Sequence, residues 1–222
     1  MAEAGAPAPG TVDASAEEAG FYHEAALNAA WTGSRLAVGG LTFAFGCFVF
    51  AYFYLRSLNS HGMWHPAGFK GPQEWAGAVI MALVVVSAAV QYAGLQRIKA
   101  GHKGTWVSAA LLALALGLAA IGLQVWQLLN LPFFPGSAGF ASVFVGATPV
   151  LLICVLAAMI WLEILIMQAR AIPEISFVEQ PPTYTEAFAV QRFQANLSAF
   201  TVYWNYLGAI AILFWVLFYL AA

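Results

Sequence analysis

The stretch AGFASVFVGATPVLLICVLAAMIWLEILIMQ, residues 138–168, is apolar along nearly its whole length and contains one charged side chain, Glu163. A helix needs about 20 apolar residues to cross a hydrocarbon core of ~30 Å. The stretch is too long and too continuous for a barrel strand, which needs only about 10 alternating residues. Since helices and closed barrels alone satisfy the backbone in lipid, we predict a transmembrane helix here.

Four more segments of the 222-residue chain have the same character. We therefore predict an all-α fold, an integral membrane bundle of five transmembrane helices at about 34–57, 74–97, 105–129, 138–168 and 196–220. Thr185 can cap a helix that begins near Glu186 and continues into the last segment. That helix is expected to project about two or three turns beyond the membrane.

The composition supports a membrane protein and excludes several other classes. Charged residues make up 8% of the chain, against roughly 25% in ordinary globular domains. Hydrophobic residues make up 62%, and the mean hydropathy is +0.80. Such a chain cannot be a soluble globular enzyme or a disordered protein. With only 8 Lys and Arg residues, it is also not expected to bind nucleic acid.

The N-terminal residues 1–30 differ from the rest because they are rich in Ala, Pro, Gly and acidic residues. Such a segment cannot bury enough apolar surface to fold alone. It also lacks the basic start and apolar stretch of a signal peptide. We predict a flexible tail over 1–30, in which residues 21–31 gain order on the membrane or on a partner, and a five-helix transmembrane domain over 31–222.

The basic residues predict the orientation of the chain in the membrane. Arg56 and Lys70 lie on one side of the predicted helices, and the other six lie on the opposite side. Because basic residues gather on the cytoplasmic side, we predict a cytoplasmic N-terminus and a C-terminus outside. The six that decide this are Arg35, Arg97, Lys99, Lys103, Arg170 and Arg192.

The 4 histidines, His23, His61, His65 and His102, all lie outside the predicted helices. Membrane haem and copper centres take their histidine ligands from helices, so we expect no cofactor-binding, metal-binding or catalytic residue in this chain. His61 and His65 have the spacing of two ligands on one helix face. Gly62 and Pro66 argue against a helix there, and a loop packed on a partner or on lipid headgroups is the preferred interpretation.

Two features of the helix over 138–168 suggest contacts with other molecules. Glu163 lies roughly 10 Å from its inner end, where an isolated carboxylate favours a structural or interfacial role over a proton relay. Ala138, Ser142 and Gly146 are spaced by four and form a seam of small residues that lets another helix approach. Pro149 follows this seam and is expected to kink the helix, which can open a lipid-filled cleft.

Three stretches resemble subunit III of the haem–copper respiratory oxidases, in the short five-helix form of bacterial quinol and cytochrome c oxidases. The first is FGCFVFAYFYLRS, residues 45–57, which resembles the first helix of that form. The second is GLQVWQLLNLPFFPGSAGFASVFVGAT, residues 122–148, which resembles an aromatic helix end, a short outer turn and the next helix start. The third is FTVYWNYLGAIAILFWVLFYL, residues 200–220, which is similar to the closing helix.

The chain departs from the family where the family has ionisable residues. Thr42 stands where the first helix usually has a carboxylate, and Asn205 and Gly208 replace a His and an Asp of the last helix, whereas Trp204 is kept. The THGxHV motif is replaced by residues 148–151 without either histidine. Because the missing residues are linked to proton uptake and lipid anchoring, the pattern favours a scaffolding role in a divergent oxidase.

The resemblance implies a non-catalytic accessory subunit III of a terminal oxidase in the bacterial plasma membrane. It implies oxidase subunit I, which bears the haem, and subunit II as partners, with haem and copper in those subunits and phospholipid bound to this chain. The complex would oxidise cytochrome c or quinol, reduce oxygen and move protons. Candidate contacts with lipid or partners are Trp126, Ser142, Gly146, Glu163, Trp204 and Asn205.

Two other functions remain open. An accessory subunit of a nitric oxide reductase shares the five-helix pattern. A small stand-alone transporter or channel is a different class of protein, and it would need a charged or polar substrate site at the bilayer midplane. The midplane of this chain is nearly free of charge, which counts against the transporter.

Overall fold

The computed structural model describes residues 14–59, 62–177 and 184–221. Its long helices are α1 (Ala14–Ser57), α2 (Glu74–Lys99), α3 (Lys103–Leu129), α4 (Gly139–Ala171) and α5 (Tyr184–Trp215). A 3-10 turn, η1 (Glu174–Phe177), precedes α5, and a π-helical turn, η2 (Val216–Leu220), follows it. The described part of the chain contains no strand, which agrees with the predicted all-α class.

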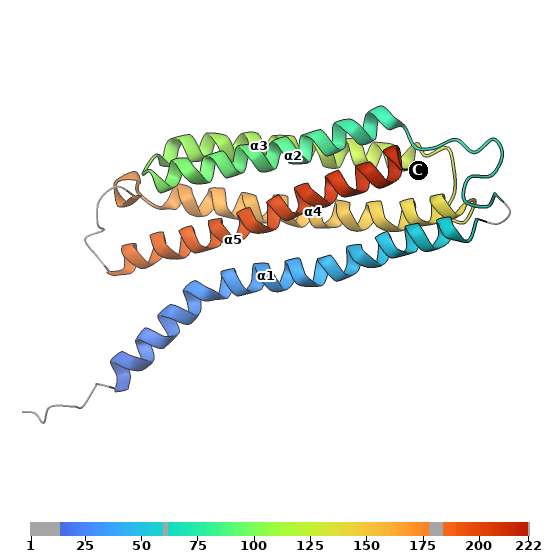
Figure 1. Cartoon of the computed structure of the whole chain (residues 1–222). Coiled ribbons are helices and arrows are strands. Elements are labelled where there is room, and N and C mark those ends of the chain that lie inside the picture. Colours follow the sequence, from blue (N-terminus) through green and yellow to red (C-terminus); the bar gives the residue numbers. More distant parts are fainter. Residues whose placement is uncertain (1–13, 60–61, 178–183, 222) are drawn as a thin grey trace, which may run out of the picture.

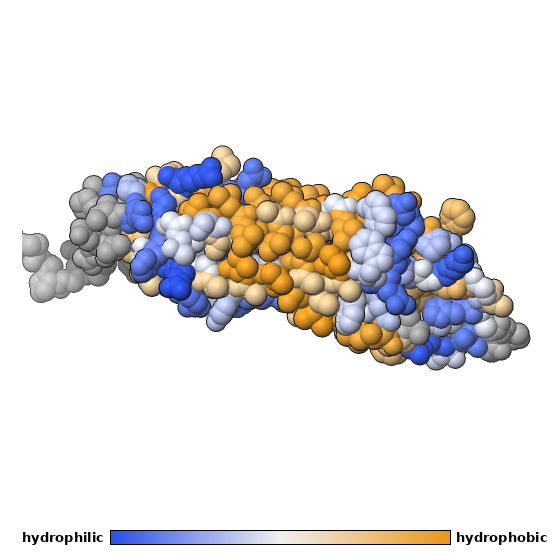
Figure 2. Space-filling model, turned by 90° about the horizontal axis from the view of Figure 1, so that it is seen from above, coloured by the Kyte–Doolittle hydropathy of each residue, from blue (hydrophilic) through white to orange (hydrophobic). Residues whose placement is uncertain are grey.

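All five long helices are long and apolar enough to cross a membrane. On the face seen in Figure 2, apolar side chains cover the middle of the bundle and hydrophilic side chains gather toward both ends. The five-helix membrane architecture predicted from the sequence is thus confirmed in length and composition. The side of the membrane on which each terminus lies stays a prediction.

The helices are arranged as a hairpin, a central pair and an outer helix (Figure 1). α2 and α3 form an antiparallel hairpin on one side, α4 and α5 lie in the middle, and α1 packs along α5 and α4 on the other side. One end of the bundle carries the connections over 58–73 and 130–138, and we call it the 58–73 end. The opposite end carries the α2–α3 turn, and we call it the 100–102 end. The short connections over 100–102 and 130–138 force α2 and α3, and α3 and α4, to run antiparallel.

The helix bounds differ from the prediction mainly at α1. This helix begins at Ala14 rather than near residue 34, so residues 14–30 of the expected tail are helical, and residues 1–13 lie outside the described residues. Ala and Glu favour helix, while Glu17, Glu18 and Glu24 lower the hydropathy of these turns, which explains why the apolar run begins later than the helix. The first part of α1 bends away from the bundle (Figure 1), and His23 contacts the ring of Phe188 with centroids 4.5 Å apart.

α5 begins at Tyr184, within two residues of the predicted start at Glu186, so Thr185 lies within the helix rather than at its cap. The projection of this helix beyond the membrane stays a prediction. Pro149 lies inside α4, and the helix is continuous from Gly139 to Ala171.

A chain of hydrogen bonds joins three helices in the middle of the bundle. The indole Nε1 of Trp204 on α5 donates to Ser87 Oγ on α2 at 3.2 Å. Ser87 Oγ donates in turn to the backbone oxygen of Ala113 on α3 at 2.7 Å. Trp204 and Ser87 are both 0% exposed, so no solvent or lipid reaches these groups. A buried polar group without a partner is costly. Here the Trp204 N–H finds its acceptor in Ser87 Oγ, and the Ser87 hydroxyl finds its acceptor in the Ala113 carbonyl.

We expect Ser87→Ala to lower the free energy of unfolding by about 1–2 kcal/mol, because the Trp204 N–H is left buried without an acceptor. Unfolding by SDS in mixed micelles, followed by tryptophan fluorescence, measures this. The matched control is Ser108→Ala, since Ser108 is exposed and bonds only within its own helix. Equal stability of the two variants would contradict a stabilising role for the hydrogen bond between Trp204 and Ser87.

Candidate functional site

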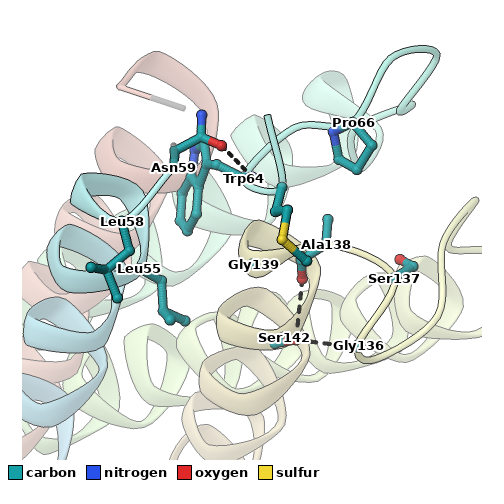
Figure 3. Close-up of a pocket in the computed structure, with 11 residues that line it drawn as sticks. Leu55, Leu58, Asn59, Trp64, Pro66, Gly136, Ser137, Ala138, Gly139 and Ser142 are labelled. Atoms are coloured by element: carbon teal, nitrogen blue, oxygen red, sulfur yellow. Dashed lines mark hydrogen bonds between the residues drawn. The ribbon is translucent and has the colours of Figure 1, made fainter. Parts of the chain in front are cut away.

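A cavity lies at the 58–73 end, where two loops meet the ends of α1 and α4 (Figure 3). Its volume is about 330 Å³. Leu55 and Leu58 line it from the end of α1, Trp64 lines it from the loop, and Ser142 lines it from α4. The cavity therefore depends on how the long loop over residues 58–73 is held against α4.

The loop is held by backbone hydrogen bonds to the first turn of α4. The N–H of Gly139 donates to the Met63 carbonyl at 3.0 Å, and the N–H of Phe140 donates to the Trp64 carbonyl at 3.5 Å. A helix begins with backbone N–H groups that lack partners within the helix, and Ala138 at the N-cap supplies no side-chain acceptor. Carbonyls of a distant loop therefore satisfy the N-terminus of α4.

Two polar side chains fix the local shape of the cavity wall. Asn59 Oδ1 accepts the backbone N–H of Trp64 at 2.8 Å. Ser142 Oγ accepts the N–H of Gly136 at 3.2 Å and donates to the Ala138 carbonyl at 3.1 Å (Figure 3). Gly136 has a φ of +85°, a backbone conformation that glycine adopts without strain. Ser142, a predicted contact residue, thus holds the turn before its own helix.

Below the cavity lies a cluster of aromatic rings centred on Phe140, which is 1% exposed. Its ring lies 5.7 Å from Trp64 of the loop, 6.3 Å from Phe133 of the short turn and 5.9 Å from Phe218 of η2. The contacts with Trp64 and Phe218 are edge-to-face, a favourable geometry for aromatic pairs. Phe140 therefore joins both loops to α4 and to the C-terminal end of the chain.

His65 belongs to the same aromatic cluster. Its imidazole stacks on Phe69 at 5.2 Å and lies 5.0 Å from the ring of Phe140. Burial lowers the pKa of His65 below its ordinary 6.5, and the positive charge of Arg56 lowers it further. His61, the other half of the predicted pair, lies outside the described residues. Among the residues that the structure describes, no group of three possible ligands is placed to hold a metal.

The chemistry of the cavity is that of a neutral amphipathic site. None of the described residues that line it is ionisable, and its polar groups are amide, hydroxyl and backbone groups. Such a lining suits an aliphatic chain that ends in an uncharged polar group, or an apolar side chain of a neighbouring protein. Among the described residues that line it, no base is present to pair with the hydroxyl of Ser137 or Ser142.

A second polar group lies between α2, α3 and the C-terminal turn. Gln127 Nε2 donates to the Gln73 carbonyl at 3.1 Å and to the Tyr219 hydroxyl at 2.9 Å, and Gln124 Nε2 donates to Gln127 Oε1 at 3.2 Å. A Cβ at Gly77 would overlap the Tyr219 ring, so the glycine makes room for this arrangement. Sequence reasoning missed Tyr219, because its partner Gln127 lies 92 residues away along the chain.

The predicted contact residues fall into two groups in the structure. Trp204 belongs to the interior of the bundle, as its bond to Ser87 shows. Gly146 faces α1, because a Cβ there would lie 3.2 Å from the Phe48 ring. The predicted small-residue seam therefore receives a helix of this same chain.

The remaining predicted residues are accessible to other molecules. Trp126 is 42% exposed and lies beside Trp75, with ring centroids 5.6 Å apart. Asn205 on α5 and Glu163 on α4 are both exposed. The structure does not bring these three together with Ser142 into one site.

No protein-family model matches this chain, and no curated protein sequence matches it.

We expect the contact of the loop with α4 to weaken as the pH falls below about 6.5, the ordinary His pKa. The docked loop lowers the pKa of His65, so the undocked loop binds the proton more tightly and gains population in acid. Hydrogen exchange of residues 62–70 at pH 7.5 and 5.5, corrected for intrinsic rates, measures the opening.

His65→Phe keeps the aromatic packing and should remove the pH dependence, whereas His102→Gln, outside the cluster, should leave it unchanged. A pH response that survives in His65→Phe would contradict the assignment.

Proposed function

We propose that this chain is a non-catalytic accessory subunit of a haem–copper terminal oxidase, of the subunit III type, in the bacterial plasma membrane. The observation that carries the proposal is that the three stretches resembling that family contact one another in the folded chain. They lie in α1, across the α3–α4 connection, and at the end of the chain in α5 and η2.

Aromatic residues make these contacts. Phe45 of the first stretch lies 5.4 Å from Phe214 of the third, in an edge-to-face arrangement. Phe144 of the second stretch lies 5.2 Å from Phe218 of the third, and Tyr52 of the first lies 6.1 Å from the same ring. Apolar helices can match one another by chance at any position. Here the matched residues form one buried cluster, which supports a shared packing scheme.

The position that carries a carboxylate in the family supports a scaffolding role. Thr42 Oγ1 donates to the Val38 carbonyl at 2.7 Å, and it lies 3.1 Å from the Tyr206 hydroxyl, within hydrogen-bond distance. A hydrogen bond between two hydroxyls can join α1 to α5 without a carboxylate. The polar groups between the helices are likewise neutral, namely Ser87, Trp204, Gln127 and Tyr219.

In this proposal the chain stabilises the haem-bearing subunit I and holds phospholipid, while haem and copper belong to subunits I and II. Electrons pass from cytochrome c or quinol to oxygen without entering this chain. The neutral cavity at the 58–73 end is suited to part of a phospholipid, because its lining combines leucines with a few uncharged polar groups.

We expect the affinity-tagged chain, solubilised in mild detergent from its native membrane, to co-purify with stoichiometric haem and with oxygen uptake. Absorbance in the Soret region and an oxygen electrode measure the two properties. The chain produced alone should lack a Soret band. A haem-containing complex that reduces nitric oxide and not oxygen would favour the reductase alternative, and a colourless homo-oligomer would contradict both.

A further inference from the structure

Glu163 is a carboxylate on a face of α4 that the rest of the chain leaves uncovered. The side chains of Leu156, Ile160 and Met167 on this face are 44%, 54% and 64% exposed. Their spacing of three or four residues from one another and from Glu163 places them all on one side of a helix. Glu163 is itself exposed, and among the described residues none bonds to or pairs with its carboxylate.

The position of Glu163 along the helix lies within the hydrocarbon layer. A Cβ at Gly117 would overlap the Met159 side chain, so these two residues are level with each other. Gly117 lies near the middle of α3, which runs from Lys103 to Leu129. Glu163 follows Met159 by one turn, or about 6 Å along the axis, while half of a hydrocarbon core is about 15 Å thick.

Neither the nearest basic residue of α4, Arg170, nor Arg35 of α1 pairs with the Glu163 carboxylate. Arg170 follows Glu163 by seven residues, about 10 Å along the helix. Arg35 of α1 lies over the Trp31 ring of its own helix, 3.6 Å from the centroid, and so already has an aromatic partner. An ionisable residue in a membrane segment is costly unless it pairs with a complementary group, and the described part of this chain does not supply one.

We propose that the face of α4 around Glu163 is the docking surface for a transmembrane helix of a different subunit. That helix would place a basic or hydrogen-donating side chain, Arg, Lys or His, opposite the carboxylate. The proposal follows from charge complementarity and from the apolar residues that surround Glu163, which would pack against a helix. It rests on the proposed function as a subunit of a larger complex, and it names the face and the chemistry of the contact.

The first experiment compares recovery of partner subunits with tagged wild-type, Glu163→Leu and Gln168→Leu chains expressed in the native membrane. Gln168 is also exposed, but five residues turn it by about 140° around the helix, so it is the matched control. We expect Glu163→Leu to reduce the partner recovered per tagged chain by at least tenfold, and Gln168→Leu to leave it unchanged.

Thermal unfolding of the isolated Glu163→Leu chain in detergent should equal that of the wild type, because Glu163 has no partner among the residues that the structure describes. A lower stability would show that the residue acts in folding, which would overturn the proposal. Partner recovery that is equal for wild type and Glu163→Leu, or equally lost in Gln168→Leu, would also overturn it.

A photo-crosslinking residue at Ile160 identifies the occupant of the face. We expect a crosslinked peptide from a transmembrane segment of another protein that contains Arg, Lys or His, and we expect the crosslink to disappear in Glu163→Leu. A peptide of this same chain, or adducts with lipid alone, would overturn the proposal.

The outcomes separate this inference from the proposed function. A haem-containing complex that survives Glu163→Leu would refute the docking surface and leave the oxidase assignment intact. A Glu163-dependent partner without haem would refute the oxidase assignment and support the docking surface.

Discussion

The packing of Phe140 is the interaction on which the 58–73 end of the structure depends. The residue stands at the start of α4, and its ring contacts rings of both loops and of the C-terminal turn. Its backbone N–H and that of Gly139 are satisfied by carbonyls of the 58–73 loop. The loop therefore needs α4 as a surface to pack on, and α4 needs the loop to complete its first turn. The cavity in Figure 3 exists because this contact holds the loop against the helix end.

Along the rest of its length, the bundle is held together by neutral groups. Aromatic rings join α1, α4 and the end of α5, and amide, hydroxyl and indole groups bond across α2, α3 and α5. Neutral hydrogen bonds in lipid join helices without the cost of a buried charge. Glu163 differs, since it is an ionisable residue within a span and it faces outward. An interior of neutral groups and an outward carboxylate agree with the proposed role of a supporting subunit in a membrane complex.

Much of the fold could be predicted because membrane helices are defined by length and hydropathy. The prediction of 105–129 for α3 is within two residues of Lys103–Leu129, and 74–97 for α2 ends two residues before Lys99. The start of α1 could not be found in this way, because glutamates in its first turns lower the hydropathy below that of a membrane span. The capping of α4 by the loop was equally hidden, since bonds from Gly139 and Phe140 to distant carbonyls leave no side-chain signature.

The candidate residues likewise divide into those whose surroundings the sequence predicts and those whose surroundings it does not. The exposed position of Glu163 agrees with the interfacial role that the sequence favours, whereas helix periodicity alone did not reveal that Trp204 is buried and bonds to Ser87 of α2. The central claim is that the outer surface of this bundle meets a haem-bearing subunit. A cryo-electron microscopy structure of the complex isolated through this chain, in native-membrane nanodiscs, tests it most directly. The account predicts a second, haem-containing bundle in contact with these helices. Five helices surrounded by lipid on every side would contradict it.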